Sequence, residues 1–162
     1  MQRRLPELAA GTPVTTVMAS PVLTVGADTP VRELLRLFVA GGIGAAPVVD
    51  SRAQPVGVVS KTDVLRAVYD DPSCAGPGAS VERDEELDAE PDMPGQDSGL
   101  RASDLMTPSP LTVPESASVA EAASLMAREH VHRLFVTGDA GTLTGVVSAM
   151  DIVSWLGGNE QE

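Results

Sequence analysis

Two stretches of the sequence decide the fold: Gly57-Val58-Val59-Ser60-Lys61-Thr62-Asp63 and Gly145-Val146-Val147-Ser148-Ala149-Met150-Asp151. They lie 88 residues apart, and the same shift gives 13 identities over the 46 positions from residue 18 to residue 63, without a gap. Self-similarity at a fixed spacing indicates repeated structural units. The chain therefore contains two copies of one unit, and each motif has a counterpart with which it can be compared.

The hydrophobic pattern changes in the same order within each copy. In the first copy it predicts a short strand at 22–25, a helix through 31–39, strands at 46–49 and 55–60, and a helix at about 62–69. We expect an N-cap within Asp28-Thr29-Pro30 and a helix end at Gly41-Gly42. In the second copy we expect a capping box of Ser118 and Glu121, strands at 133–137 and 143–148, and a helix at about 150–156.

This order of elements is β-α-β-β-α in each copy. A strand, a crossover helix and a parallel strand form a right-handed unit, to which the third strand adds as an antiparallel hairpin. One such unit, of about 50 residues, leaves apolar surface exposed, and a second copy would cover it. The predicted fold class is therefore α/β (α+β), with two repeats packed with pseudo-twofold symmetry.

The charge of the chain is concentrated in one segment. The net charge is −12, and residues 70–103 hold ten acidic and two basic side chains, which amount to −8 of it. High charge with few apolar residues cannot offset the entropy of ordering, so most of this segment is predicted to be a disordered linker. The alternative within it is a short helix around 81–89. The expected organisation is an N-terminal extension at 1–13, repeats at 14–69 and 104–157, the linker at 70–103 and a tail at 158–162.

Composition excludes several classes of function. A pI near 4.4 and 2% aromatic residues argue against nucleic-acid binding, which needs basic surfaces and stacking platforms. The single cysteine, Cys74, cannot form an internal disulfide, and a reducing compartment suits it. The sequence has no apolar run long enough to cross a bilayer and no signal-peptide pattern. We expect a soluble, cytoplasmic protein without membrane or nucleic-acid partners.

The Ser-x-x-Asp step carries the clearest chemistry. Ser60 and Ser148 end predicted strands, and Asp63 and Asp151 lie in the first turn of the helices that follow. Hydroxyl, carboxylate and free backbone N–H groups therefore converge, and a carboxylate can accept hydrogen bonds from both hydroxyls of a ribose diol. The same spacing also suits a simple helix cap. The residues alone leave both interpretations open, and the two are compatible.

Two such motifs at matched positions in a β-α-β-β-α repeat are a specific signal. The sequence resembles a tandem pair of cystathionine-β-synthase (CBS) domains, a Bateman module. The resemblance runs from about Val14 to Leu156 apart from the linker. It includes two leader segments, Val17-Met18-Ala19-Ser20-Pro21 and Leu105-Met106-Thr107-Pro108-Ser109-Pro110, and two strand leads, Gly42-Ile43-Gly44-Ala45-Ala46-Pro47-Val48 and Val131-His132-Arg133-Leu134-Phe135-Val136.

The resemblance implies a sensor without catalytic activity of its own. Such a module binds an adenine nucleotide (AMP, ADP or ATP) in the cleft between its two CBS domains and transmits occupancy to a regulated partner, as in energy sensing. It also implies a homodimer formed through the helices. Two other functions stay open: an interaction module with empty clefts, and a CBS pair that binds S-adenosylmethionine.

The resemblance also implies which residues share a ligand, because the aspartate of one repeat faces the strand lead of the other. The ribose would be held by Ser60 and Asp63 in one cleft and by Ser148 and Asp151 in the other. His132 and Arg133 would bind phosphate in the Asp63 cleft, whereas Gly44 and Ala45 offer no such donors in the Asp151 cleft. Backbone and adenine contacts are expected from Pro21, Val22, Gly44 and Ala45 in the Asp151 cleft and from Ser109 and Pro110 in the Asp63 cleft.

Enzymatic and metal sites find no support in the sequence. Ser60 and Ser148 have no adjacent histidine base that would make them nucleophiles. His130-x-His132 lacks a third ligand at metal-binding spacing. We therefore expect no catalytic residue, no metal and no required cofactor.

Overall fold

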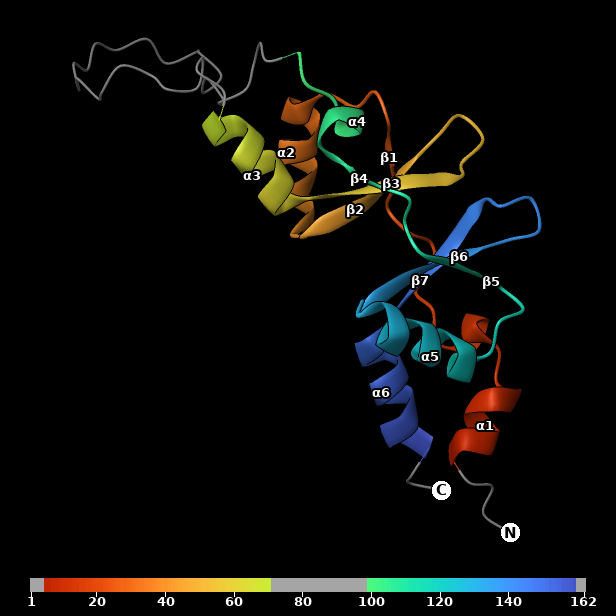
Figure 1. The fold of residues 1–162 in the computed structure, drawn as a ribbon. Helices are drawn as coiled ribbons and strands as arrows, with labels where there is room; N and C mark the ends of the chain where they lie inside the picture. The colour runs from red at the N-terminus through yellow and green to blue at the C-terminus, as the bar shows by residue number, and fades with distance from the viewer. Residues whose placement is uncertain (1–4, 71–98, 160–162) are drawn as a thin grey trace, which may run out of the picture. The chain divides into compact units, whose positions relative to one another are not determined.

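The structure is a computed structural model that describes residues 5–70 and 99–159 (Figure 1). Its contacts divide the chain into two compact units, each assembled from separate stretches of sequence. The first-repeat unit contains Thr24–Val48 and Gly57–Pro108, and the second-repeat unit contains Met1–Leu23, Val49–Val56 and Ser109–Glu162. Each unit is described separately below.

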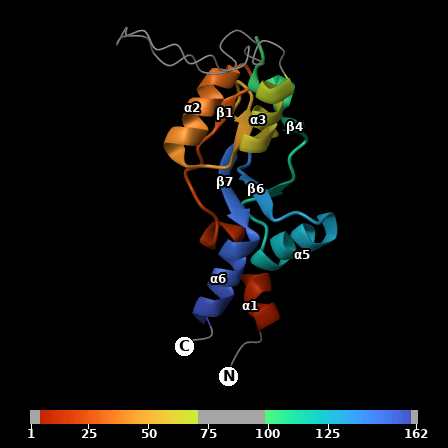
Figure 2. The ribbon, with the colours of Figure 1, turned by 90° about the vertical axis from the view of Figure 1, so that its left-hand side faces the viewer.

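The first-repeat unit is a four-stranded sheet with helices. The strand order is β1 (Val25–Gly26), β2 (Ala45–Val49), β3 (Pro55–Ser60) and β4 (Thr107–Pro108), and β4 pairs antiparallel with β3. Helices α2 (Val31–Gly41) and α3 (Lys61–Asp70) pack side by side, as Figure 2 shows, and α4 (Ala102–Leu105) contacts α3. The core is mostly aliphatic and contains Val31, Leu34, Phe38, Val48, Val59 and Val64.

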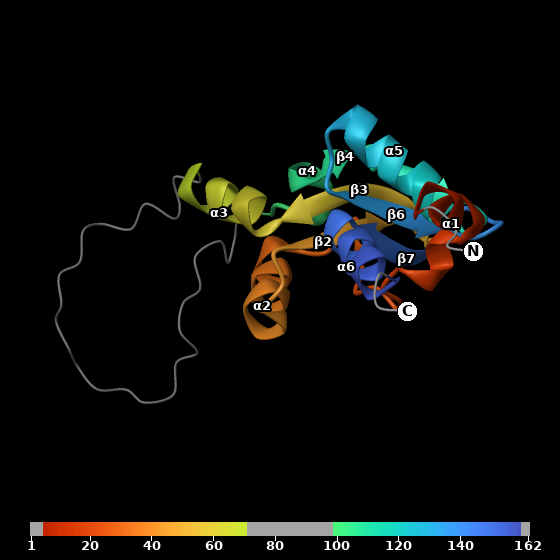
Figure 3. The same ribbon diagram turned by 90° about the horizontal axis from the view of Figure 1, so that it is seen from below.

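The second-repeat unit shows the predicted topology clearly. Strand β5 (Thr112–Pro114) pairs parallel with β6 (Arg133–Thr137), and β6 pairs antiparallel with β7 (Leu143–Ser148). Helices α5 (Val119–Glu129) and α6 (Ala149–Asn159) lie against β6 and β7 (Figure 3). Helix α1 (Leu5–Gly11) packs against α5. The α/β fold class and the strand, helix, strand, hairpin order are confirmed here.

The leader of each repeat folds onto the sheet of the other repeat. Val14, in the 3-10 helix Val14–Thr16, is fully buried in the second-repeat core, and its N–H donates to Ala117 O at 2.7 Å. Ala19 forms a β-bridge with Val146. In the first-repeat unit, the leader of the second repeat supplies α4 and β4, and Ala102 N donates to Thr29 O at 2.8 Å. The compact units are therefore not the two continuous repeats of the sequence.

Helix ends match the sequence predictions in part. The capping box is confirmed: Glu121 N donates to Ser118 Oγ at 3.2 Å, and Ser118 N donates to Glu121 Oε2 at 2.7 Å. Gly42 ends α2 in the left-handed conformation, with φ of 60°. The N-cap predicted for Asp28-Thr29-Pro30 is wrong in its mechanism, because Pro30 occupies the cap without a side-chain hydrogen bond.

The predicted linker overlaps the described part of the chain only at its ends. Helix α4 begins at Ala102, within the range 70–103 that we expect to be linker. The short helix considered near 81–89 lies outside the described residues. Helix α1 lies within the N-terminal extension predicted at 1–13.

Candidate functional site

The two Ser-x-x-Asp motifs form nearly identical turns. Strand β3 ends at Ser60 and α3 begins at the next residue; β7 and α6 are joined in the same way at Ser148. Asp63 Oδ2 accepts hydrogen bonds from Ser60 N at 2.9 Å and from Ser60 Oγ at 2.6 Å. Asp151 Oδ2 accepts the same two bonds from Ser148, both at 2.7 Å. The serine hydroxyls in turn accept from the aspartate N–H groups, at 3.2 and 3.1 Å.

This geometry confirms the helix-cap interpretation, and it leaves one oxygen of each aspartate carboxylate without a hydrogen bond from a described residue. Each aspartate binds its serine through Oδ2, and no described residue donates a hydrogen bond to its second oxygen, Oδ1. Both aspartates are half-buried. Because the serine fixes the carboxylate, Oδ1 of each aspartate is an oriented acceptor that a ligand hydroxyl can use without reorganisation of the side chain.

The glycine that begins each motif allows the leader segment to approach the sheet. A β-carbon on Gly57 would lie 2.8 Å from Met106 Cγ, and one on Gly145 would lie 3.0 Å from Met18 Cγ. A β-carbon at either position would therefore force the methionine to shift, and glycine avoids this. Sequence reasoning did not pair Met18 with Gly145 or Met106 with Gly57, although all four recur at the 88-residue spacing.

The leader segments run beside the strands that end in the two motifs. Ser20 Oγ donates to Thr144 O at 2.8 Å, which places the start of Pro21-Val22 beside β7, in the unit that contains Ser148 and Asp151. Ser109 N donates to Val56 O at 3.3 Å, which places the start of Ser109-Pro110 beside β3, the strand that ends at Ser60. Ser109 has a left-handed φ of 58°, a conformation that sequence did not predict.

Each strand lead lies beside the Ser-x-x-Asp motif of its own repeat. Arg133 is opposite Ser148 in the β6–β7 ladder, and Ala149 N donates to His132 O at 3.0 Å. Gly44 and Ala45 correspond in the first repeat, where Lys61 N donates to Gly44 O at 2.8 Å. Both His132 and Arg133 are exposed. Among the pairings that the resemblance implies, Pro21 and Val22 lie in the same unit as Asp151, whereas the others join residues of different units. All of these pairings stay predictions.

The described residues contain neither a metal-ligand cluster nor a membrane-spanning helix. Residues 5–70 and 99–159 contain no group of three or more His, Cys, Asp or Glu side chains that could hold a metal ion. No helix in this part of the chain is long and apolar enough to cross a membrane.

The fold and the paired motifs define a tandem CBS-domain protein. The family model for the CBS domain matches residues 14–70 and 102–158, and the chain belongs to this family. The chain is 31% identical over 133 residues to the chloroplastic CBS domain-containing protein CBSX1 of Arabidopsis thaliana, which covers 77% of this chain and 55% of that protein. It is 24% identical to the gamma subunit of the 5'-AMP-activated protein kinase of Kluyveromyces lactis, over 86% of this chain and 38% of the subunit.

Solved structures agree with this assignment. The crystal structure of CBSX2 in complex with AMP superposes with a TM-score of 0.68 at 26% identity, covering 93% of this chain and all of that one. The CBS domain of a membrane protein from Sphaerobacter thermophilus gives 0.67 at 26% identity, covering 92% and 90%.

The relatives limit what family membership says of the whole protein. An inosine-5'-monophosphate dehydrogenase of Korarchaeum cryptofilum is 29% identical over 81% of this chain, which spans only 21% of that enzyme. The chain spans less than half the length of the first curated relatives it matches. CBS pairs are in general regulatory modules, and some of them are parts of enzymes. Among the solved structures, CBSX2 is in complex with AMP, the CBS domain of a bacterial CNNM/CorC family Mg2+ transporter with ATP, and MJ0100 with methylthioadenosine and S-adenosylmethionine.

Proposed function

We propose that this protein is a regulatory module, without catalytic activity of its own, that binds an adenine nucleotide and passes its occupancy to a partner protein. The observation that carries the proposal is the oriented Oδ1 of Asp63 and of Asp151, each held by its own serine. A carboxylate fixed in this way suits the 2′,3′-diol of a ribose. The AMP complex of CBSX2, at 26% identity, supports an adenosine ligand.

The remaining ligand contacts follow from the family resemblance. His132 and Arg133 are exposed and carry the N–H donors that a phosphate needs, with Arg133 able to donate two at once. We assign them to the nucleotide held by Asp63, together with Ser109 and Pro110. The nucleotide held by Asp151 would contact Pro21, Val22, Gly44 and Ala45. Since Gly44 and Ala45 have no cationic side chain, we expect the Asp63 position to bind more tightly.

Thermal unfolding with and without AMP tests the nucleotide proposal. A ligand at one hundred times its Kd adds about 2.7 kcal/mol of stability, which raises Tm by several degrees in a chain of this size. AMP and ATP should raise Tm, whereas 2′,3′-dideoxy-AMP, which lacks the diol, should not. No shift with any adenosine compound at millimolar concentration would overturn the proposal and favour a module that acts by contact alone.

Three matched variants separate ribose binding from helix capping. Asp63→Asn and Asp151→Asn remove the carboxylate but keep a side-chain oxygen. Asp104→Asn is the control, because Asp104 Oδ2 also caps a helix, accepting from Arg101 N at 2.8 Å, and has no assigned ligand. Asp63→Asn should abolish most of the AMP-induced shift, Asp151→Asn less of it and Asp104→Asn none. Equal loss in all three variants would contradict the ribose role.

A competition experiment distinguishes the two classes of adenosine ligand. S-adenosylmethionine shares the ribose but carries a positive sulfonium in place of the phosphate, so His132 and Arg133 should disfavour it. Isothermal titration should therefore give a lower Kd for AMP. A lower Kd for S-adenosylmethionine would transfer the assignment to that ligand.

A further inference from the structure

The tips of the two hairpins are joined by two hydrogen bonds within the second-repeat unit. Residues 49–56, which come from the first repeat, belong to this unit by their contacts. Leu143 N donates to Ala53 O at 2.9 Å, and Gln54 Nε2 donates to Ala140 O at 2.9 Å. We call these two hydrogen bonds the hairpin clasp. None of its four residues is among the proposed nucleotide contacts, so the clasp needs a separate explanation.

The hairpin of the first repeat holds Gln54 in place for this contact. Asp50 Oδ1 accepts hydrogen bonds from Arg52 N at 2.8 Å and from Gln54 N at 2.9 Å, which closes the loop with a side chain. On the opposing hairpin, Gly141 leaves room for the amide, because a β-carbon there would lie 3.2 Å from Gln54 Nε2. The amide of Gln54 is therefore oriented by its own loop and accommodated by a glycine.

The clasp breaks the symmetry of the two repeats. At the 88-residue shift, Leu143 corresponds to Pro55, and Gln54 corresponds to Thr142. Pro55 has no N–H, so the reciprocal of the bond from Leu143 cannot form. Thr142 has a shorter side chain without an amide. The clasp therefore depends on residues in which the repeats differ, and it does not follow from the repetition itself.

The backbone next to the clasp holds both leader segments. Val56 O accepts a hydrogen bond from Ser109 N at 3.3 Å, and Thr144 O accepts one from Ser20 Oγ at 2.8 Å. Val56 and Thr144 are equivalent at the 88-residue shift, and each is within two residues of the clasp. The leaders are thus connected to each other by an unbroken series of covalent and hydrogen bonds inside one unit.

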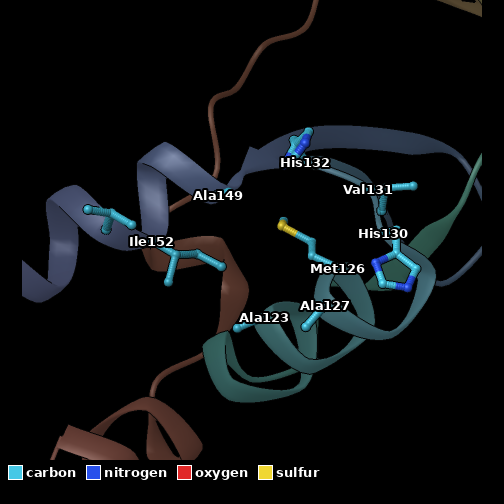
Figure 4. A pocket seen from close by; sticks show the side chains of 9 residues that line it. Ala123, Met126, Ala127, His130, Val131, His132, Ala149 and Ile152 are labelled. Atoms are coloured by element: carbon cyan, nitrogen blue, oxygen red, sulfur yellow. The ribbon is translucent and has the colours of Figure 1, made fainter.

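The two strands that leave the clasp end at the two Ser-x-x-Asp motifs. Strand β3 runs from Pro55 to Ser60, and β7 runs from Leu143 to Ser148. At the far end of β7, Ala149 N donates to His132 O at 3.0 Å, and Figure 4 shows both residues there. Because regular elements transmit displacement along their length, a movement at either motif reaches the clasp.

We propose that the hairpin clasp couples the two nucleotide positions, with Gln54 as a positioning residue. A nucleotide that displaces the leader at Ser109 moves Val56, and the clasp passes this movement to Leu143 and so to the leader at Ser20. The effect on the second position is a coupling free energy, and it is reciprocal. This regulation rests on the proposed function, whereas the mechanical connection between the leaders does not.

Hydrogen exchange of the full chain without ligand tests the connection. Gln54→Glu keeps the size of the side chain but removes its N–H donor. The Leu143 amide should exchange about fivefold faster and that of Val146, which bonds to the first leader, about twofold faster. The Ala102 amide, in the first-repeat unit, should not change and reports that the fold is intact. Thr142→Glu places the same charge on the other hairpin and should change none of these rates.

Faster exchange at Leu143 alone would confine the clasp to the hairpins and overturn the proposal. Gln54→Lys supplies a new N–H donor at the same position, and it should restore most of the protection at Leu143 and at Val146. Equal acceleration in the Glu and Lys variants would mean that the size of the side chain, and not its donor, matters, which also contradicts the proposed role of Gln54.

NMR of ¹³C-labelled methionine methyl groups tests the coupling with nucleotide. In the Asp151→Asn protein, which keeps the Asp63 position, AMP should shift the signals of Met106 and Met18, one from each leader. Adding Gln54→Glu should abolish the shift of Met18 and leave that of Met106. A Met18 shift that persists would overturn the coupling and leave the proposed function intact. If AMP shifts neither signal, the proposed function fails, and the exchange rates alone decide whether the clasp connects the leaders.

Discussion

Met106 lies against Gly57 so closely that the glycine has no room for a β-carbon: added there, it would stand 2.8 Å from Met106 Cγ. The same relationship joins Met18 to Gly145 in the other unit. The same methionine–glycine contact therefore joins each leader segment to the strand that ends in the Ser-x-x-Asp motif of the other repeat.

Replacing this glycine should destabilise the protein. Gly57→Ala forces Met106 or the backbone to move, and overpacking of this kind costs typically 1–3 kcal/mol. Chemical denaturation should show a lower free energy of unfolding by about 2 kcal/mol. Gly41→Ala is the control in the same unit, because its β-carbon would make only an ordinary contact, 3.7 Å from Ile43. Equal effects of the two substitutions would contradict the close-approach explanation.

Equivalent hairpin positions should respond in opposite directions. Ala53 has a φ of 59°, and its counterpart in the second repeat, Gly141, has a φ of 75°. The left-handed conformation costs an L-residue about 1–2 kcal/mol. Ala53→Gly should therefore raise Tm, and Gly141→Ala should lower it, also because a β-carbon there would lie 3.2 Å from Gln54 Nε2. If scanning calorimetry shows that both substitutions change Tm in the same direction, the explanation from the left-handed conformation is wrong.

The serine caps should contribute equally to stability in the two repeats. Ser60 and Ser148 make the same three hydrogen bonds with their aspartates, at distances that agree within 0.2 Å. Loss of a serine N-cap costs about 1 kcal/mol. Urea unfolding of Ser60→Ala and Ser148→Ala should show nearly equal losses of about that size in the absence of ligand. An effect in one repeat alone would mean that the two turns are not equivalent.

The capping box of α5 should make stability depend on pH. Hydrogen bonds from the backbone and side chain of Ser118 hold the pKa of Glu121 below its ordinary value of 4.5. Because the folded pKa is the lower one, the stabilisation is complete above the unfolded value and is lost as pH falls through the folded pKa. The stability difference between the wild type and Glu121→Gln, followed by denaturation from neutral to acid pH, should shrink on acidification. A difference that stays constant would rule out this contribution.

Local signals predicted much of this structure because they act over a few residues. The Ser118–Glu121 box and the stop at Gly42 depend on neighbouring backbone groups, so the sequence pattern was sufficient. The cap expected within Asp28-Thr29-Pro30 failed because Pro30, which has no side-chain acceptor, is the N-cap residue, and the first helical N–H, that of Val31, donates to the distant Leu100 O at 3.1 Å. The sequence near Asp28 gives no sign that the segment at Leu100-Arg101 packs there.

The Ser-x-x-Asp motifs of the candidate site could be predicted from the sequence, whereas the backbone conformation of the neighbouring segments was harder to predict. The hydrogen bonds of Asp63 and Asp151 follow from the Ser-x-x-Asp spacing. The left-handed φ of His130 could have been inferred from Gly42 at the equivalent position, whereas that of Ser109 has no glycine counterpart, since Pro21 occupies that place.

The exchanged leaders have a consequence for any chain that contains one repeat alone. Cutting the backbone anywhere in 71–98 would not release the two compact units, because each unit draws residues from both sides of the cut. A polypeptide with a single repeat would lack the leader that its own sheet requires, and it could obtain one only from another molecule. Two single-repeat chains would therefore complete their sheets only by exchanging leaders, an exchange that the tandem chain makes within one molecule.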